Sequence, residues 1–105
     1  MARETSRTTE EVVKDFVDEA GREVRIEAAY WFGSTVRKGA DEDSDIDVAV
    51  VSPDFTALRF QNAKKLFPAV IRVDSRIEIH PYSPSDFNEG TPLVSEIIRT
   101  GKKIV

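Results

Sequence analysis

Residues 33–47 read GSTVRKGADEDSDID and join a turn of small residues to a pair of carboxylates. An apolar run over residues 28–32 precedes the turn, and a second apolar run over residues 46–51 follows the first carboxylate. Short apolar runs bounded by polar loops are typical of buried strands. The stretch therefore predicts two strands whose ends carry polar groups, an arrangement typical of the edge of an active site.

The length and composition limit the class of protein. A chain of 105 residues is long enough for one domain with a modest core, so we expect a single domain over residues 1–105. The net charge of −4 argues against general duplex nucleic-acid binding, which needs dense Lys and Arg. The chain has no cysteine, which excludes disulfides, thiolate metal sites and a cysteine nucleophile.

The start of the chain carries no targeting signal. Residues 1–7 are polar and lack the apolar core of a secretion signal, and no window approaches the roughly 20 apolar residues of a membrane span. We therefore expect residues 1–7 to be disordered and the protein to be cytoplasmic, with no membrane partner. The sequence leaves open whether the protein forms a homo-oligomer.

Three helices are predicted from start and stop signals. The first starts at a capping box, in which Thr8 and Glu11 each satisfy a free amide, and ends at Gly21. The other two start where a Ser or Thr cap precedes a proline, and each ends at a Pro or Gly. They are expected over residues 52–68 and 91–101.

Strands are predicted where apolar residues alternate or run together. They are expected over residues 22–32, 45–51 and 70–80, with a bend at Asp74-Ser75, and the tail over residues 102–105 adds a short edge strand. The order of helices and strands is that of an α/β or α+β domain. We therefore expect a mixed sheet of three to four strands with helices packed on it.

Two aspartates stand at the start of the strand over residues 45–51. In an extended strand, Asp45 and Asp47 project to the same side with their Cα atoms about 6.6 Å apart. Two like charges so close together are unfavourable unless a cation lies between them. The pair therefore predicts a hard divalent ion such as Mg²⁺.

Glu78 is the candidate third carboxylate. Ile77 and Ile79 point inward, so Glu78 faces the other way, and a strand paired with residues 45–51 lies only about 4.8 Å from it. A cluster of three carboxylates can hold two metal ions roughly 3.5 to 4 Å apart, which favours phosphoryl or nucleotidyl transfer. The alternative is a solvent-facing acid on an edge strand, paired with a nearby cation.

Gly33 and Ser34 outline a cradle for a triphosphate. Gly33 has no side chain, so a phosphate can approach its backbone, and Ser34 offers a hydroxyl and an amide near the cap of a short helix expected over residues 35–40. Arg37 and Lys38 are the nearest cations for neutralising phosphate charge. We favour Arg37 for this role without excluding Lys38.

The pattern of Gly33-Ser34, ten residues and then Asp45-Ile46-Asp47 resembles the signature of the nucleotidyltransferase superfamily, which includes DNA polymerase β and kanamycin nucleotidyltransferase. The short chain most resembles the minimal nucleotidyltransferase (MNT) family, over roughly residues 10–105. The resemblance implies a polymerase β-like nucleotidyltransferase fold and a nucleoside triphosphate substrate. It also implies two Mg²⁺ ions on Asp45, Asp47 and Glu78, with triphosphate contact at Gly33 and Ser34.

The same resemblance implies a partner. In the MNT family the usual partner is a helical HEPN protein, the pair behaves as an antitoxin and a toxin, and some members transfer AMP from ATP to a tyrosine of the partner. The implied function is therefore metal-dependent transfer of AMP from ATP to a hydroxyl of a partner protein, with this chain as the antitoxin.

Three positions depart from the family pattern, because many relatives have arginine at the position of Thr35, glycine at the position of Lys38, and aspartate as the third carboxylate, which is Glu78 here. These departures, and the absence of a second domain, leave a second function open: a catalytically weak or inactive module that neutralises a helical partner by masking it. His80 is interpreted as a strand-end or surface residue, the acids at 41–43 as a hydrated loop, and Trp31 as a core or interface residue.

Overall fold

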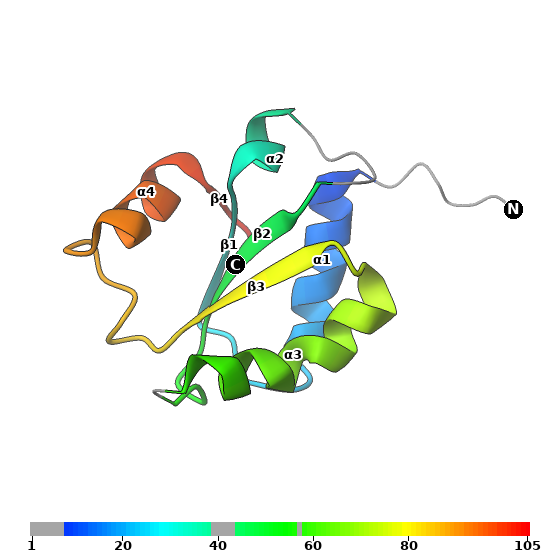
Figure 1. The fold of residues 1–105 in the computed structure, drawn as a ribbon, viewed down its shortest axis with the longest axis horizontal. Helices are drawn as coiled ribbons and strands as arrows, with labels where there is room; N and C mark the ends of the chain where they lie inside the picture. Colours follow the sequence, from blue (N-terminus) through cyan, green and yellow to red (C-terminus); the bar gives the residue numbers. More distant parts are fainter. Residues whose placement is uncertain (1–7, 39–43, 57) are drawn as a thin grey trace, which may run out of the picture.

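The computed structural model describes residues 8–38, 44–56 and 58–105, whose arrangement is shown in Figure 1. The described residues form one four-stranded sheet in the order β3-β2-β1-β4. The strands are β1 (Ala28–Phe32), β2 (Ile46–Val51), β3 (Ile77–Tyr82) and β4 (Lys102–Lys103). β1 is antiparallel to both β2 and β4, whereas β2 and β3 are parallel. The expected mixed sheet is confirmed.

Helices cover both faces of the sheet (Figure 1). α1 (Thr9–Ala20) and α3 (Arg59–Val73) lie on one face, and α4 (Pro92–Thr100) lies on the other. The short helix α2 (Ser34–Lys38) follows β1 at the end of the sheet. This arrangement leaves the end of β1 and the start of β2 at the same edge of the domain.

β2 is the centre of the core. Its residues alternate between the two faces of the sheet, as those of any strand do. Ile46, Val48 and Val50 belong to the larger core cluster with α1 and α3, whereas Ala49 and Val51 belong to the smaller cluster with α4. All five side chains are buried. The apolar run in the sequence is therefore explained by a strand that is covered on both sides.

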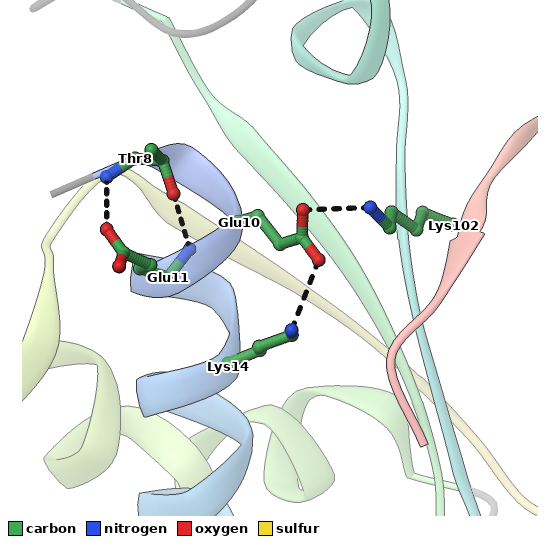
Figure 2. Close-up of polar contacts among 5 residues, drawn as sticks. All are labelled: Thr8, Glu10, Glu11, Lys14 and Lys102. Atoms are coloured by element: carbon green, nitrogen blue, oxygen red, sulfur yellow. Dashed lines mark hydrogen bonds and ion pairs between the residues drawn. The ribbon is translucent and has the colours of Figure 1, made fainter.

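The start of α1 has the predicted capping box (Figure 2). The Thr8 hydroxyl accepts a hydrogen bond from the Glu11 amide at 3.1 Å, and the Glu11 carboxylate accepts one from the Thr8 amide at 2.8 Å. Glu10 pairs with Lys102 at 2.8 Å and with Lys14 at 3.2 Å. Lys102, and to a lesser extent Lys14, lower the pKa of Glu10 below its usual 4.5. Because Lys102 belongs to β4, this contact joins α1 to the last strand.

The strand predicted over residues 22–32 is wrong at its start, because β1 begins at Ala28. The amides that follow α1 bond back to the carbonyls of Glu19 and Ala20 and form a turn instead. The neighbouring strand β2 ends at Val51, which is the register partner of Ala28. Earlier residues therefore have no stretch of β2 beside them to extend the ladder.

The helix predicted from residue 52 is also wrong at its start. Ser52 organises a tight turn, because its hydroxyl accepts a hydrogen bond from the Asp54 amide at 3.0 Å and its carbonyl accepts one from the Phe55 amide at 3.2 Å. The buried Asn62 then closes the loop with hydrogen bonds to the backbone of Thr56 at 2.9 and 2.6 Å. The Ser-Pro pair therefore begins a loop, and α3 starts only at residue 59.

The predicted stop at Pro68 is wrong, since Pro68 lies inside α3. Proline cannot donate to the carbonyl of Lys64, but both residues are exposed, so water can satisfy that carbonyl. α3 then continues over residues that were predicted to begin the strand over residues 70–80. β3 instead includes Pro81, which is tolerated because β3 is at the edge of the sheet.

The last helix agrees with the sequence prediction, and the predicted edge strand is present but covers only Lys102–Lys103 of the expected residues 102–105. α4 follows Thr91 and ends at Gly101, and β4 follows directly. A Cβ on Gly101 would lie 2.6 Å from the carbonyl oxygen of Ile97 and 3.0 Å from that of Trp31, so only glycine lets α4 end this close to β1. No helix within the described residues has the length and apolar character needed to cross a membrane. The predictions for residues 1–7 and 41–43 lie outside the described residues.

Candidate active site

The parallel pairing of β2 with β3 brings Asp47 and Glu78 side by side. The two acids are register partners, and Asp47 is also the partner of Phe32 in β1. Asp47 precedes Ala49 by two residues, so it occupies the face of β2 that carries α4. The site therefore lies on the α4 face of the sheet, where β1 ends and β2 begins.

His80 completes this group from the same face of β3. Its Nε2 lies 3.0 Å from Oδ1 of Asp47 and 3.8 Å from Oε2 of Glu78. Each of the three residues offers one ligand atom, and these atoms all lie within 4.8 Å of one another. The His80 ring packs edge-on against Phe32 with the ring centroids 4.9 Å apart. The imidazole is thus held toward the two carboxylates.

Gly33 follows β1 and lies against Asp47. Its φ is +89°, in the region that favours glycine. A Cβ at this position would lie 2.5 Å from Oδ2 of Asp47. The sequence assigned Gly33 to phosphate approach, and the structure adds a second reason for glycine, because any side chain there would collide with the carboxylate.

Ser34 and Arg37 follow Gly33 in α2 and share a cavity with it. α2 begins at Ser34, close to the prediction, and residues 39–40 of the predicted helix lie outside the described residues. All three residues line one cavity of about 380 Å³, which residues of α4 also line. Arg37 is exposed, so its guanidinium is free to meet an anionic ligand in this cavity.

Thr35 attaches α2 to the sheet. Its side chain is 2% exposed, and its Oγ1 accepts a hydrogen bond from the Trp31 indole at 2.9 Å. Trp31 is buried as predicted, and its Nε1–H needs an acceptor in the core. Position 35 therefore serves the core in this chain, and Arg37 is the basic residue of α2 that lines the cavity.

Asp45 is not part of the three-residue group. It directly precedes β2 and is exposed. Together with Glu78 it lines a second cavity, of about 310 Å³, to which Phe67 of α3 also contributes. Glu78 therefore belongs to the three-residue group and also lines the second cavity. Asp45 and Asp47 are not gathered into one ligand group.

Two carboxylates and an imidazole fit a divalent cation. Ligand atoms that bind one ion at about 2.1 Å and at right angles lie about 3.0 Å apart. The observed separations of 3.0 and 3.8 Å from His80 are close to this spacing. The cluster of Asp47, Glu78 and His80, whose ligand atoms lie within 4.8 Å of one another, can therefore bind a metal ion once these atoms move closer together.

His80 is the site residue that the sequence interpretation missed. A signal existed, because a residue two positions after Glu78 lies on the same face of a strand, and His80 is the only histidine of the chain. The missing information was the register that places Ala49 opposite His80 and so brings the imidazole beside Asp47.

A comparison with known families agrees with this geometry. A family model described as a nucleotidyltransferase domain matches residues 10–104. No match was found among curated proteins or among solved structures. The mixed sheet and helices of the described residues are consistent with the polymerase β-like nucleotidyltransferase fold. The chain belongs to the family of nucleotidyltransferase domains.

Proposed function

We propose that this chain transfers AMP from ATP to a hydroxyl group of a partner protein. Membership of the nucleotidyltransferase domain family supports nucleotidyl transfer in general. The resemblance to minimal nucleotidyltransferases supports a protein acceptor, with this chain acting as the antitoxin of an MNT/HEPN pair and a helical HEPN-type protein as its partner. Residues 1–105 then work as one minimal nucleotidyltransferase domain.

One observation carries the proposal: the carboxylate of Asp47, which groups with Glu78 and His80, lies beside Gly33. Oδ2 of Asp47 lies against Gly33, and Gly33 also lines the cavity that contains Ser34 and Arg37. A triphosphate that contacted Gly33 in that cavity would therefore lie next to the Asp47 carboxylate. Carboxylates beside a phosphate-sized cavity with a cation are the arrangement that nucleotidyl transfer needs.

In this proposal Asp45, Asp47 and Glu78 hold divalent cations, two Mg²⁺ ions by the family resemblance. Such ions neutralise phosphate charge and activate an attacking hydroxyl when they are bound. Asp45 is exposed and lines the second cavity together with Glu78, which supports its share in this role.

The protein residues perform the remaining steps. Gly33 and Ser34 contact the triphosphate, and Arg37 neutralises part of its charge. The acceptor oxygen forms a bond to the α-phosphorus while the bond from that phosphorus to the bridging oxygen breaks, and diphosphate leaves. Glu78, whose side chain is about half exposed, orients the acceptor hydroxyl and accepts its proton.

The test is an intact-mass measurement. The full chain is incubated with ATP, Mg²⁺ and the proposed partner, a HEPN-type protein sought in the neighbouring gene. We expect the partner to gain one adenylyl group, and we expect no gain with the double variant Asp45→Asn, Asp47→Asn. Asp18→Asn, an exposed change in α1 on the opposite face of the sheet, is the matched control and should keep the transfer. The proposal fails if the partner gains no mass or if the double variant transfers equally well.

A second function is favoured by apolar side chains on the outer side of α3. Phe60, Phe67 and Ile71 are 71%, 43% and 78% exposed. Their spacing of seven and four residues places them along one side of the helix. Such a stripe can be buried by an amphipathic helix of a partner. This observation supports a module that neutralises a helical protein by masking it, without catalysis.

Transfer and masking can be distinguished by measuring partner binding and partner neutralisation with the same variants. If masking is the function, replacing Phe67 and Ile71 with serine abolishes binding and neutralisation, while the double aspartate variant still neutralises. If transfer is the function, the double aspartate variant binds the partner but does not neutralise it.

A further inference from the structure

We propose that His80 is a metal ligand of this site and that it gives the position between Asp47 and Glu78 a preference for a first-row transition-metal ion, such as Mn²⁺, over Mg²⁺. The inference rests on the proposed function, because it concerns the same site. It goes beyond that function by adding a nitrogen ligand and a choice of metal.

The geometry supports coordination by all three residues. Nε2 of His80 lies 3.0 Å from Oδ1 of Asp47 and 3.8 Å from Oε2 of Glu78. The three ligand atoms come from two adjacent parallel strands, so their spacing is set by the register of the sheet and not by a loop. A rigid framework of this kind fixes the ligand set before a metal binds.

The surroundings keep the imidazole directed into the site. The side chains of His80 and Asp47 are 21% and 25% exposed, so both are largely shielded from water. The ring of Phe32 packs edge-on against the imidazole of His80 and limits its movement on that side. Pro81 follows His80 directly and restricts the backbone there. The nitrogen that faces the carboxylates is therefore Nε2.

The chemistry of the three ligands determines the choice of metal. Mg²⁺ prefers oxygen ligands in octahedral geometry and keeps several waters. Imidazole nitrogen is a ligand for transition metals, whose affinity for mixed nitrogen and oxygen sites rises along the first row. A site with two carboxylates and one imidazole should therefore bind Mn²⁺ more tightly than a site of carboxylates alone, with a much smaller gain for Mg²⁺.

A positioning role is the competing interpretation. At 3.0 Å, His80 can form a hydrogen bond with Asp47 and only orient that carboxylate, as outer residues of metal sites often do. His80→Gln distinguishes the two roles, because glutamine keeps an amide donor for Asp47 but removes the imidazole nitrogen.

The first measurement is affinity. The full-length protein, freed of metal with a chelator, is titrated with Mn²⁺ and with Mg²⁺ in a calorimeter. We expect His80→Gln to weaken Mn²⁺ binding at least about tenfold and to change Mg²⁺ binding by less than about twofold. Unchanged Mn²⁺ affinity, or an equal loss for both ions, would overturn the proposal.

The second measurement is direct. His80 is the only histidine of the chain, so protein labelled with ¹⁵N-histidine carries one labelled imidazole. Pulsed electron paramagnetic resonance should detect coupling between bound Mn²⁺ and this nitrogen, and the coupling should disappear in His80→Gln. Mn²⁺ bound without nitrogen coupling overturns the proposal.

Asp47→Asn separates this inference from the proposed function. If Asp47→Asn abolishes Mn²⁺ binding while His80→Gln has no effect, only the role of His80 is wrong. If Asp47→Asn keeps full binding with nitrogen coupling, His80 is a ligand but the site assigned to nucleotidyl transfer is wrong.

Discussion

Oδ2 of Asp47 occupies the space where a side chain on Gly33 would begin, because a Cβ there would lie 2.5 Å from that oxygen. The φ of +89° at Gly33 is a second reason for glycine. The turn and the second aspartate of the motif are thus packed against each other. The spacing of the motif in the sequence is matched by a direct contact in the fold.

Gly33→Ala should therefore be destabilising and should also disturb the site. Forcing a non-glycine residue into this backbone conformation costs about 1–3 kcal/mol, and the methyl group displaces the Asp47 carboxylate. Urea unfolding and Mn²⁺ titration measure the two effects. Gly21→Ala is the matched control, since Gly21 has φ −64° and a Cβ there meets no atom closer than 3.4 Å. The control should be neutral or stabilising by about 0.4–1 kcal/mol. Equal stability of the two variants would contradict this interpretation of Gly33.

The contact between Trp31 and Thr35 predicts a second stability effect. Thr35→Val keeps the shape of the side chain but leaves the buried indole Nε1–H without its acceptor. The free energy of unfolding should fall by about 1–3 kcal/mol, because the lost partner leaves a buried donor unsatisfied. Thr35→Ser keeps the hydroxyl and should recover most of that loss. Urea unfolding in which Thr35→Val matches the wild type would show that the hydrogen bond is not needed.

The sequence predicted correctly those helices whose ends are fixed by neighbouring residues in the chain. The capping box at Thr8 and the Thr91-Pro92 start each act within one turn of a helix, so no tertiary information was needed. The Ser52-Pro53 pair predicted a helix start in the same way, but this prediction was wrong, because the Ser52 hydroxyl accepts a hydrogen bond within a turn. Pro68 misled as well, because an exposed proline can remain inside a helix that packs on its other side.

The part of the candidate site that depends on the pattern within one strand or one motif could be predicted from the sequence. Gly33, Asp47 and Glu78 were recognised from the motif and from the alternation of β3, and the structure brings them together. The role proposed for His80 depends on which residues of β2 stand beside β3, and that register is a long-range property of the sheet. The separation of Asp45 from the ligand group was not predictable either, since it depends on where β2 begins.

The corrected position of α3 predicts a contrast between two of its residues. Leu66 is fully buried, whereas Phe60 is 71% exposed. Leu66→Ala should lower the free energy of unfolding by about 2–5 kcal/mol, because it leaves a cavity in the core. Phe60→Ala should change it by no more than about 0.5 kcal/mol. A large loss for Phe60→Ala in urea unfolding would instead support a helix that turns this residue inward.

The ion pairs of Glu10 predict a pH-dependent contribution to stability. Lys102 first, and Lys14 second, lower the pKa of Glu10 below its usual 4.5 in the folded protein. A lowered folded pKa means that the contribution is fully present above about 4.5 and is lost as the pH falls through the lower folded value. The stability difference between the wild type and Glu10→Gln should therefore shrink from neutral pH to about pH 3 and also shrink with added salt, because the group is exposed. A difference that is constant across this range would show that the pairs of Figure 2 do not act through charge.

Calorimetric titration of the full chain with ATP in the presence of Mg²⁺ is the most direct test of the proposed metal and nucleotide site at Asp47. The wild type and the control Asp18→Asn should bind ATP with the same affinity, because Asp18 lies on α1 at the opposite face of the sheet. Asp47→Asn should bind at least about tenfold more weakly, since it removes a proposed metal ligand. Binding of ATP with Mg²⁺ by Asp47→Asn as tight as that of the wild type would contradict the assignment of the site.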